Sequence, residues 1–81
     1  MLRFYYENGQ LKHIGRYKEG RETGEGKFYY ENGQLRYIGN YKKGYKVEKW
    51  NYFHENGKLS SEGYYTDGIK YSFIIGEKTG L

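Results

Sequence analysis

The stretch Phe28-Tyr29-Tyr30-Glu31-Asn32-Gly33-Gln34-Leu35 decides the fold, because the chain repeats it. The same eight residues occur unchanged 24 residues earlier, at 4–11, and with conservative changes 24 residues later, at 52–59. A fixed period of this length indicates an internal structural repeat. We therefore predict one repeat domain over 1–81, with units at about 2–25, 26–49 and 50–73 and a tail at 74–81.

The composition favours β-structure. The chain has 81 residues, of which twelve are tyrosine and thirteen are glycine. Aromatic side chains suit a pleated surface and glycine permits tight turns, whereas no apolar stripe at helical spacing is sustained. At this length the chain is one domain or a fragment of a longer array, and it buries only about 60–65% of its unfolded surface. The sequence therefore predicts an all-β fold with a small core.

Charge and apolar content limit the classes of partner and location. Fourteen Lys and Arg against ten Asp and Glu give a net charge of +4, which favours acidic partners in general. The longest wholly apolar run is Phe73-Ile74-Ile75, and no apolar signal core stands near Met1. There is no cysteine, so disulfides and thiolate metal sites are excluded. We expect a cytoplasmic protein.

Two glycine turn signals recur in each unit. The first is Asn-Gly, at 8–9, 32–33 and 56–57, and the second is Glu-Gly, Lys-Gly or Asp-Gly, at 19–20, 43–44 and 67–68. If each pair is a two-residue type I′ turn, seven strands form a single-layer antiparallel meander. The Glu-Gly and Lys-Gly turns could instead be three-residue loops with a bulge. The predicted strands are 2–7, 10–18, 21–31, 34–42, 45–55, 58–66 and 69–75.

The Asn-Gly turns also predict a register. Counting outward from Asn56-Gly57 pairs His54 with Leu59, Tyr52 with Ser61 and Trp50 with Gly63. A large ring that lies flat over a glycine recovers part of the stability that glycine costs a strand. We therefore predict that Trp50 lies over Gly63, so that Gly63→Val would displace its ring. A simple bulge or bend at these glycines is the alternative.

Alternation along the strands assigns side chains to two faces. The principal face is rich in large rings and glycines, and we expect neighbouring rings to stack because the sequence offers no second layer to cover them. Its members are Leu2, Phe4, Tyr6, Leu11, Gly15, Tyr17, Gly24, Gly26, Phe28, Tyr30, Leu35, Tyr37, Gly39, Tyr41, Trp50, Tyr52, Leu59, Gly63 and Tyr65. The opposite face has an apolar midline flanked by cations and includes Arg3, Tyr5, Lys12, Ile14, Arg16, Lys27, Tyr29, Arg36, Ile38, Lys49 and Phe53.

No constellation predicts catalysis, a cofactor or a metal. Glu7, Glu31 and Glu55 recur, but each flanks a turn, where a polar residue is expected. His13 and His54 stand in different units and lack a second ligand at metal-binding spacing. We therefore interpret the two histidines as surface or stacking residues and the chain as non-enzymatic.

Exposed rings between cations on the second face form the candidate binding surface. Such a surface could bind an acidic strip of another protein, anionic lipid headgroups or single-stranded nucleic acid. Alternatively, the cations only keep an aromatic sheet soluble, with their stems lying across the rings. The candidate partner-binding residues are Tyr5, Lys12, Arg16, Lys27, Tyr29, Arg36 and Lys49.

The last predicted strand, Ile69–Ile75, is an edge that favours association. It is β-prone, nearly uncharged and free of proline, which are the properties of a strand that pairs with another chain. We expect either homo-oligomers through this strand or a fold-back of residues 76–81 over it.

The unit Gly24-Glu25-Gly26-Lys27-Phe28-Tyr29-Tyr30-Glu31-Asn32-Gly33, followed by Gly39-Asn40-Tyr41-Lys42-Lys43-Gly44, resembles the MORN repeat family, and the closer resemblance is to its bacterial variant. Proteins of that kind are often named antitoxins of the YwqK family. The resemblance implies a hairpin-repeat scaffold that binds another protein, and it covers nearly all of 2–68. The chain departs from the pattern in having Leu2 and Gly26 in place of the tryptophan, and Glu48 in place of a glycine.

Overall fold

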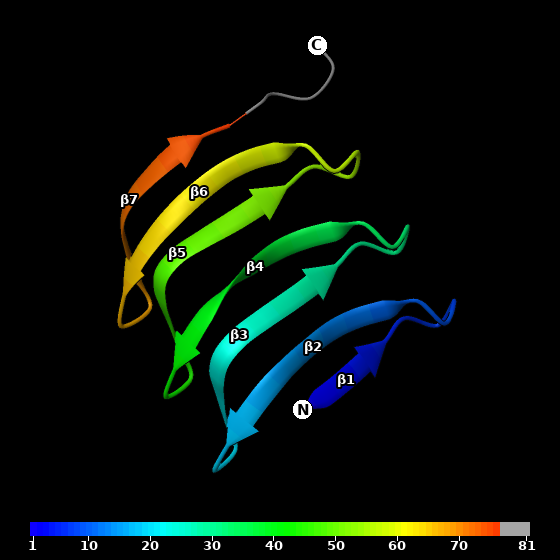
Figure 1. Ribbon diagram of the computed structural model, residues 1–81, viewed down its shortest axis with the longest axis horizontal. Helices are drawn as coiled ribbons and strands as arrows, with labels where there is room; N and C mark the ends of the chain where they lie inside the picture. Colours follow the sequence, from blue (N-terminus) through cyan, green and yellow to red (C-terminus); the bar gives the residue numbers. More distant parts are fainter. Residues whose placement is uncertain (77–81) are drawn as a thin grey trace.

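The computed structural model describes residues 1–76, and these form one antiparallel meander (Figure 1). Each strand pairs with the next one in the chain, in the order β1-β2-β3-β4-β5-β6-β7. The strands are β1 (Leu2–Tyr5), β2 (Leu11–Lys18), β3 (Arg21–Tyr29), β4 (Leu35–Lys42), β5 (Tyr45–Phe53), β6 (Leu59–Thr66) and β7 (Ile69–Ile75). The predicted all-β meander of seven strands is confirmed.

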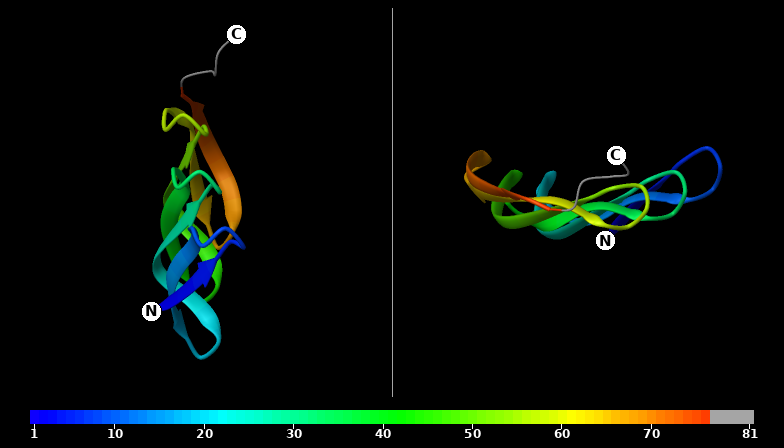
Figure 2. Two further views of the ribbon diagram at one scale, coloured as in Figure 1. Left: turned by 90° about the vertical axis from the view of Figure 1, so that its right-hand side faces the viewer. Right: turned by 90° about the horizontal axis from the view of Figure 1, so that it is seen from above.

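The sheet is a single curved layer, as the two side views show (Figure 2). Its principal extents are 44 × 35 × 12 Å, and the shortest is close to the thickness of one sheet with its side chains. Among the described residues no helix is long and apolar enough to cross a membrane. Apart from glycines, the buried residues among 1–76 are Trp50, Tyr65 and His13, at 0%, 8% and 8% exposure.

The Asn-Gly pairs are not two-residue turns, which corrects the prediction. Gly9 N–H donates to Tyr6 O (3.0 Å) and Tyr6 N–H donates to Gln10 O (2.9 Å), which closes a three-residue loop. Gly9 has a φ of 88°, and Asn8 Oδ1 accepts a hydrogen bond from Gln10 N–H. The asparagine side chain thus binds the backbone two residues on, an arrangement that favours a type I turn followed by a glycine bulge.

The type I′ turns are instead the second set. Glu19 and Gly20 have φ values of 52° and 77°, and Lys18 pairs with Arg21 across them. Lys43-Gly44 and Asp67-Gly68 repeat this geometry. Two consecutive residues at positive φ are what a type I′ hairpin requires. The strands that end at the longer Asn-Gly loops are therefore shorter than predicted, because 6–10, 30–34 and 54–58 belong to the loops.

Most of the predicted register is correct. Trp50 pairs with Gly63 and Tyr52 with Ser61, as the turn spacing predicted, and the equivalent pairs of the other units are Leu2 with Gly15 and Gly26 with Gly39. The pairing of His54 with Leu59 is wrong, because the partner of Leu59 is Phe53. A bulge lies between Tyr52 and Phe53, and it absorbs the extra residue of the three-residue loop.

The ring of Trp50 lies over Gly39, not over Gly63. A Cβ atom on Gly39 would lie 2.0 Å from Trp50 Cδ2, whereas a Cβ atom on Gly63 would meet Tyr65 and Lys70 instead. Trp50 Nε1 donates a hydrogen bond to Asn40 O at 3.1 Å, which holds the indole on the β4 side. The predicted effect of Gly63→Val on Trp50 is therefore wrong, and Gly39 is the glycine on which the ring depends.

A row of rings in contact runs across the strands on this side of the sheet, with its first three pairs stacked and its last pair tilted. The row begins on β1 and ends on β5, with centroid separations of 5.4, 4.0, 4.4 and 5.7 Å between successive members. Its members are Phe4, His13, Phe28, Tyr37 and Tyr52, which we call the ring ladder. Trp50 packs edge-on against Tyr41 and Tyr65 beside it. We call this side of the sheet the aromatic face and the opposite side the second face.

Side chains also join one unit to the next. Tyr6 Oη donates to Tyr29 O, and Tyr30 Oη donates to Phe53 O, both at 2.6 Å. The asparagines act in the same way, because the side-chain amide of Asn8 donates to Glu31 O and that of Asn32 to Glu55 O. Each Tyr-Glu-Asn-Gly segment is thus stacked on the following one by two hydrogen bonds, which explains why the motif recurs at one spacing.

A second irregularity lies in the middle of β3 and β5. Gly24 has a φ of 66° where β3 bulges against β2, and the equivalent residue of β5, Glu48, has a φ of 62°. The sequence thus places a glutamate where the fold requires the left-handed region, which costs an L-residue about 1 kcal/mol.

Glu48→Gly is therefore expected to raise the free energy of unfolding by about 0.5–1 kcal/mol, which corresponds to an increase in Tm of roughly 4–8 °C per kcal/mol. The matched control is Gly24→Glu, which should lower it by about the same amount, since a Cβ atom there meets only Arg16 Cδ at 3.8 Å. Thermal unfolding of the three proteins measures both effects. Equal stability of Glu48→Gly and the unaltered chain would show that the bulge tolerates glutamate without strain.

Candidate functional site

Lys46, near the start of β5, is surrounded by rings of the aromatic face. Its Nζ lies 4.8 Å from the Trp50 ring centroid and 5.1–5.6 Å from three tyrosine centroids. Those tyrosines are Tyr37, Tyr52 and Tyr65. Nζ also donates a hydrogen bond to Tyr52 Oη at 3.2 Å. Each ring attracts the ammonium by about 0.5–2 kcal/mol, so the lysine is held in one place.

The equivalent residues of the other units differ in charge. Lys70 on β7 lies 5.7–5.8 Å from the rings of Tyr52, Tyr65 and Phe73. The first unit has Glu22 instead. Burial, and then the charge of Glu22, raises the pKa of Tyr41 well above its ordinary value. The charge at this repeat position therefore changes sign along the sheet, from negative at Glu22 on β3 to positive at Lys46 on β5 and Lys70 on β7.

The tyrosines around Lys46 are neutral donors and acceptors. Tyr52 Oη and Tyr65 Oη share a hydrogen bond. Burial, followed by this hydrogen bond, raises the pKa of Tyr52 far above its ordinary value of 10.0. Near neutral pH the phenol is therefore un-ionised, so it can orient a ligand but is not a base.

Beside Lys46 the aromatic face is hollowed, with a volume of about 360 Å³. Arg36 stands on its other side, with Cζ 5.4 Å from the Tyr30 centroid and 5.7 Å from the Tyr37 centroid. The residues that line the hollow are Tyr30, Arg36, Tyr37, Lys46, Tyr52, Phe53, His54 and Ser60. We call it the Arg36–Lys46 hollow. It contains two cations and no carboxylate.

The seven predicted binding residues do not lie together on the second face. Lys12 Nζ lies 5.5 Å from the Tyr6 centroid, and Arg36 lies over Tyr30 and Tyr37, so both contact rings of the aromatic face. Their assignment to the opposite face is wrong, because the chain bulges at each of these positions. Two residues of a bulge can project on the same side, which interrupts the alternation.

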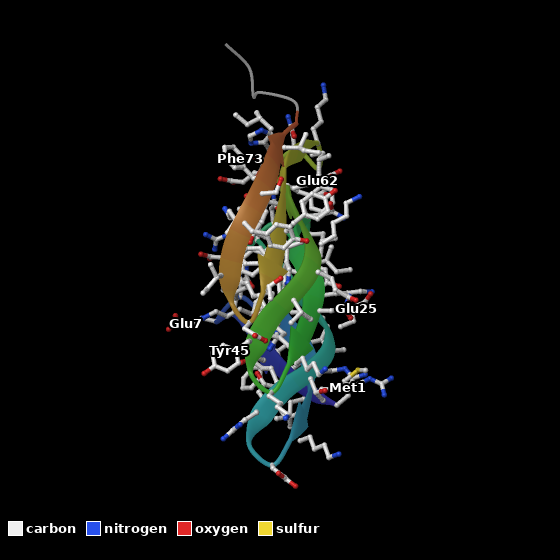
Figure 3. All side chains as sticks on the ribbon, turned by 90° about the vertical axis from the view of Figure 1, so that its left-hand side faces the viewer. Met1, Glu7, Glu25, Tyr45, Glu62 and Phe73 are labelled. Carbon is white, nitrogen blue, oxygen red and sulfur yellow. The ribbon has the colours of Figure 1, made fainter. Side chains whose placement is uncertain are left out.

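The other cations remain on the second face, where carboxylates accompany them. Arg16 and Lys27 line one hollow with Glu25, and Lys27 Nζ lies 3.9 Å from Glu25 Oε1. Lys49 Nζ lies 3.5 Å from Glu62 Oε2. Figure 3 shows Glu25 and Glu62 projecting on one side of the sheet and Phe73 on the other. The second face is therefore of mixed charge, and its role in binding stays a prediction.

The two predicted aromatic members of that surface differ in exposure. Tyr5, at the end of β1, is 59% exposed. Tyr29 is half-buried, and its carbonyl accepts the hydrogen bond from Tyr6 Oη. Tyr5 could therefore contact a partner directly, whereas the Tyr29 backbone already joins two repeat units.

His13 is a member of the ring ladder. It stacks on Phe28 at 4.0 Å, and its ring nitrogens are within hydrogen-bond distance of Lys27 O and Tyr17 Oη. Among residues 1–76 no group of three His, Cys, Asp or Glu could hold a metal ion. Its arrangement is that of a packed, hydrogen-bonded ring, as the stacking interpretation expected.

Comparison with known proteins identifies the family to which the repeat is similar. The family model described as MORN repeat variant matches residues 2–19, 22–43 and 49–67. These three matches contain the three Glu-Asn-Gly loops and cover more than half of the chain. No curated protein and no solved structure gives a significant match.

Proposed function

Because the chain belongs to the MORN repeat variant family, whose repeats are binding and scaffold modules, we propose that it is a non-enzymatic scaffold that binds another protein. An antitoxin-type or accessory binding protein is one form of this function. The observation that carries the proposal is the exposed outer strand, β7. Ile69, Tyr71, Phe73, Ile74 and Ile75 are each 55–71% exposed, which is unusual for five large apolar side chains in one strand.

Backbone pairing gives β7 a specific way to bind. Within residues 1–76 its only strand neighbour is β6, so over this range the N–H and C=O groups on its other side have no strand partner. The alternative, a fold-back of residues 76–81, falls beyond Gly76 outside the described residues. An added strand would satisfy these groups and cover the apolar side chains at the same time. The proposed docking element is therefore the outer edge of β7.

The 24-residue period makes a second copy of the chain a suitable partner. In the repeat, β7 is equivalent to residues 21–27, which form the first part of β3. In the same way β1 is equivalent to residues 26–29, which form the last part of β3. On β2, residues 16–18 pair with β3 but not with β1. If β7 of one copy lies along residues 16–18 of the next, the two copies continue one sheet. Such head-to-tail contacts do not close on themselves and permit longer assemblies.

Sedimentation velocity over a range of concentrations tests this proposal. We expect dimers or longer assemblies, and Phe73→Lys should weaken association by about tenfold or more, since a charge on an edge strand opposes pairing. Tyr45→Lys is the matched control, because Tyr45 is 56% exposed on the interior strand β5, and it should leave association unchanged. A chain that stays monomeric at the highest concentration, or equal effects of both variants, would contradict the role of β7.

A further inference from the structure

We propose that the Arg36–Lys46 hollow binds the carboxylate of an Asp or Glu side chain on a protein partner. The inference rests on the proposed function, in that it takes the ligand to be a protein. It concerns a different surface from β7, namely the aromatic face between β4 and β6. The argument depends on charge, on the fixed positions of the two cations and on a comparison between repeat units.

The charge of this hollow is unlike that of its neighbours. Three other hollows on the sheet each have at least one carboxylate in the lining. The first has Glu19 and Glu22, the second has Glu25, and the third has Glu48 and Asp67. Within residues 1–76 neither Arg36 nor Lys46 has a carboxylate within ion-pair distance, whereas Lys27 and Lys49 do. Two uncompensated cations at one concave site attract an anion.

The rings hold both cations in place before any ligand arrives. Arg36 lies over Tyr30, whose hydroxyl is fixed by its hydrogen bond to Phe53 O. Lys46 lies among four rings and uses one of its three N–H donors on Tyr52 Oη. Both cations are close to the same Tyr37 ring. Binding therefore costs little side-chain entropy, which is the condition for a preorganised site.

Comparison of the units singles out this hollow. The first unit has Lys12 in the place of Arg36 and Glu22 in the place of Lys46, so it supplies a carboxylate of its own. The third has Ser60 and Lys70 at the same positions and thus only one cation. Only the middle unit combines two cations, so the predicted site is single although the scaffold is repeated.

The lining favours a carboxylate side chain over a free ion. The planar guanidinium of Arg36 can pair with both oxygens of a carboxylate. Rings of Tyr37, Tyr52 and Phe53 form apolar walls against which the methylene groups of a glutamate can pack. A free phosphate would use the cations but not these walls.

A titration of the folded, isotope-labelled chain with an oligoglutamate peptide, monitored by nuclear magnetic resonance, tests the proposal. We expect saturable shifts of the Arg36 side-chain N–H and of the Lys46 and Phe53 amides, and none with an oligoglutamine peptide of the same length. Arg36→Gln should weaken binding by about tenfold. The matched control is Lys12→Gln, because Lys12 has the same place in the first unit and is also exposed. This control should bind like the unaltered chain.

Several outcomes would overturn the assignment. These are equal binding of the oligoglutamine peptide, shifts centred away from the hollow, or equal effects of the Arg36 and Lys12 variants. Inorganic phosphate or single-stranded oligonucleotide binding as tightly at the same residues would also overturn it, since the site would then not select a protein carboxylate. Repeating the titration with Phe73→Lys separates this inference from the proposed function, because peptide binding should persist when association through β7 is weakened.

Discussion

Gly39→Ala is expected to lower the free energy of unfolding by about 3 kcal/mol or more, the largest effect of any single methyl group added to this sheet. The new Cβ would stand 2.0 Å from Trp50 Cδ2 and 2.2 Å from Cε2, so the indole would have to leave its place. Trp50 is the one fully buried side chain among residues 1–76, and its hydrogen bond to Asn40 O would break as well. Urea unfolding followed by tryptophan fluorescence measures both the stability and the exposure of the ring.

Gly63→Ala is the matched control. Gly63 pairs with Trp50 across β5 and β6, but a Cβ atom there would meet Tyr65 Cε1 at 3.0 Å and Lys70 Cε at 3.3 Å. The Lys70 stem is flexible and the Tyr65 ring needs to shift by only a few tenths of an ångström, so we expect a loss of about 1 kcal/mol and an indole that stays over Gly39. Equal losses for the two alanine variants would show that the indole does not depend on Gly39 in particular.

Phe28→Ala is expected to lower the free energy of unfolding by about 2–3 kcal/mol. Phe28 is in the middle of the ring ladder, stacked between His13 at 4.0 Å and Tyr37 at 4.4 Å. Without its ring, the two halves of the ladder lose contact, and His13 and Trp50 become exposed on that side. Denaturant unfolding monitored by circular dichroism measures the loss.

Phe4 provides the control, since it has the same position in the first unit. It lies at the end of the ladder, is 44% exposed and stacks only on one side, on His13 at 5.4 Å. Phe4→Ala should therefore cost about 1 kcal/mol, less than half of the effect at Phe28. Similar losses at both positions would contradict a role for continuous stacking and would favour simple burial of each ring by itself.

Sequence periodicity predicted the strands and most of their pairing. The 24-residue repeat with two turn signals per unit permits only a meander of hairpins, and the pairing of Trp50 with Gly63 follows by counting from Asn56-Gly57. That count survives because the extra loop residue is absorbed by a bulge between Tyr52 and Phe53, before Trp50 is reached. Register in the strand interior could therefore be predicted even though the turn type was wrong.

The type of the Asn-Gly turns and the position of the Trp50 ring could not be predicted, because each depends on a hydrogen bond that the sequence pattern does not show. Asn-Gly is the strongest short signal for a type I′ turn, but here the Asn8 side chain binds Gln10 N–H and Glu31 O. The second contact comes from the neighbouring unit, so local propensity does not include it. The Trp50 ring likewise has a glycine on each side, Gly39 on β4 and Gly63 on β6. The hydrogen bond from its Nε1 to Asn40 O holds it over Gly39.

The candidate site was predicted only in part. The sequence singled out Arg36, but alternation placed it on the wrong face because the bulge at this position is not visible in the sequence. Lys46 was missed, although its position has a charged residue in every unit. Its environment comes from Tyr37, Trp50, Tyr52 and Tyr65 on three different strands, and only the assembled sheet brings these rings together.

A double-mutant cycle between Gly39 and Trp50 tests most directly whether rings seated on glycine hold this single-layer sheet together. Trp50→Leu is the suitable partner change, since the first unit has Leu2 at the same position. We predict that Gly39→Ala lowers the free energy of unfolding by about 3 kcal/mol with Trp50 present and by less than about 1 kcal/mol with leucine there, a coupling of roughly 2 kcal/mol. Additive losses, with no coupling between the two positions, would contradict the account.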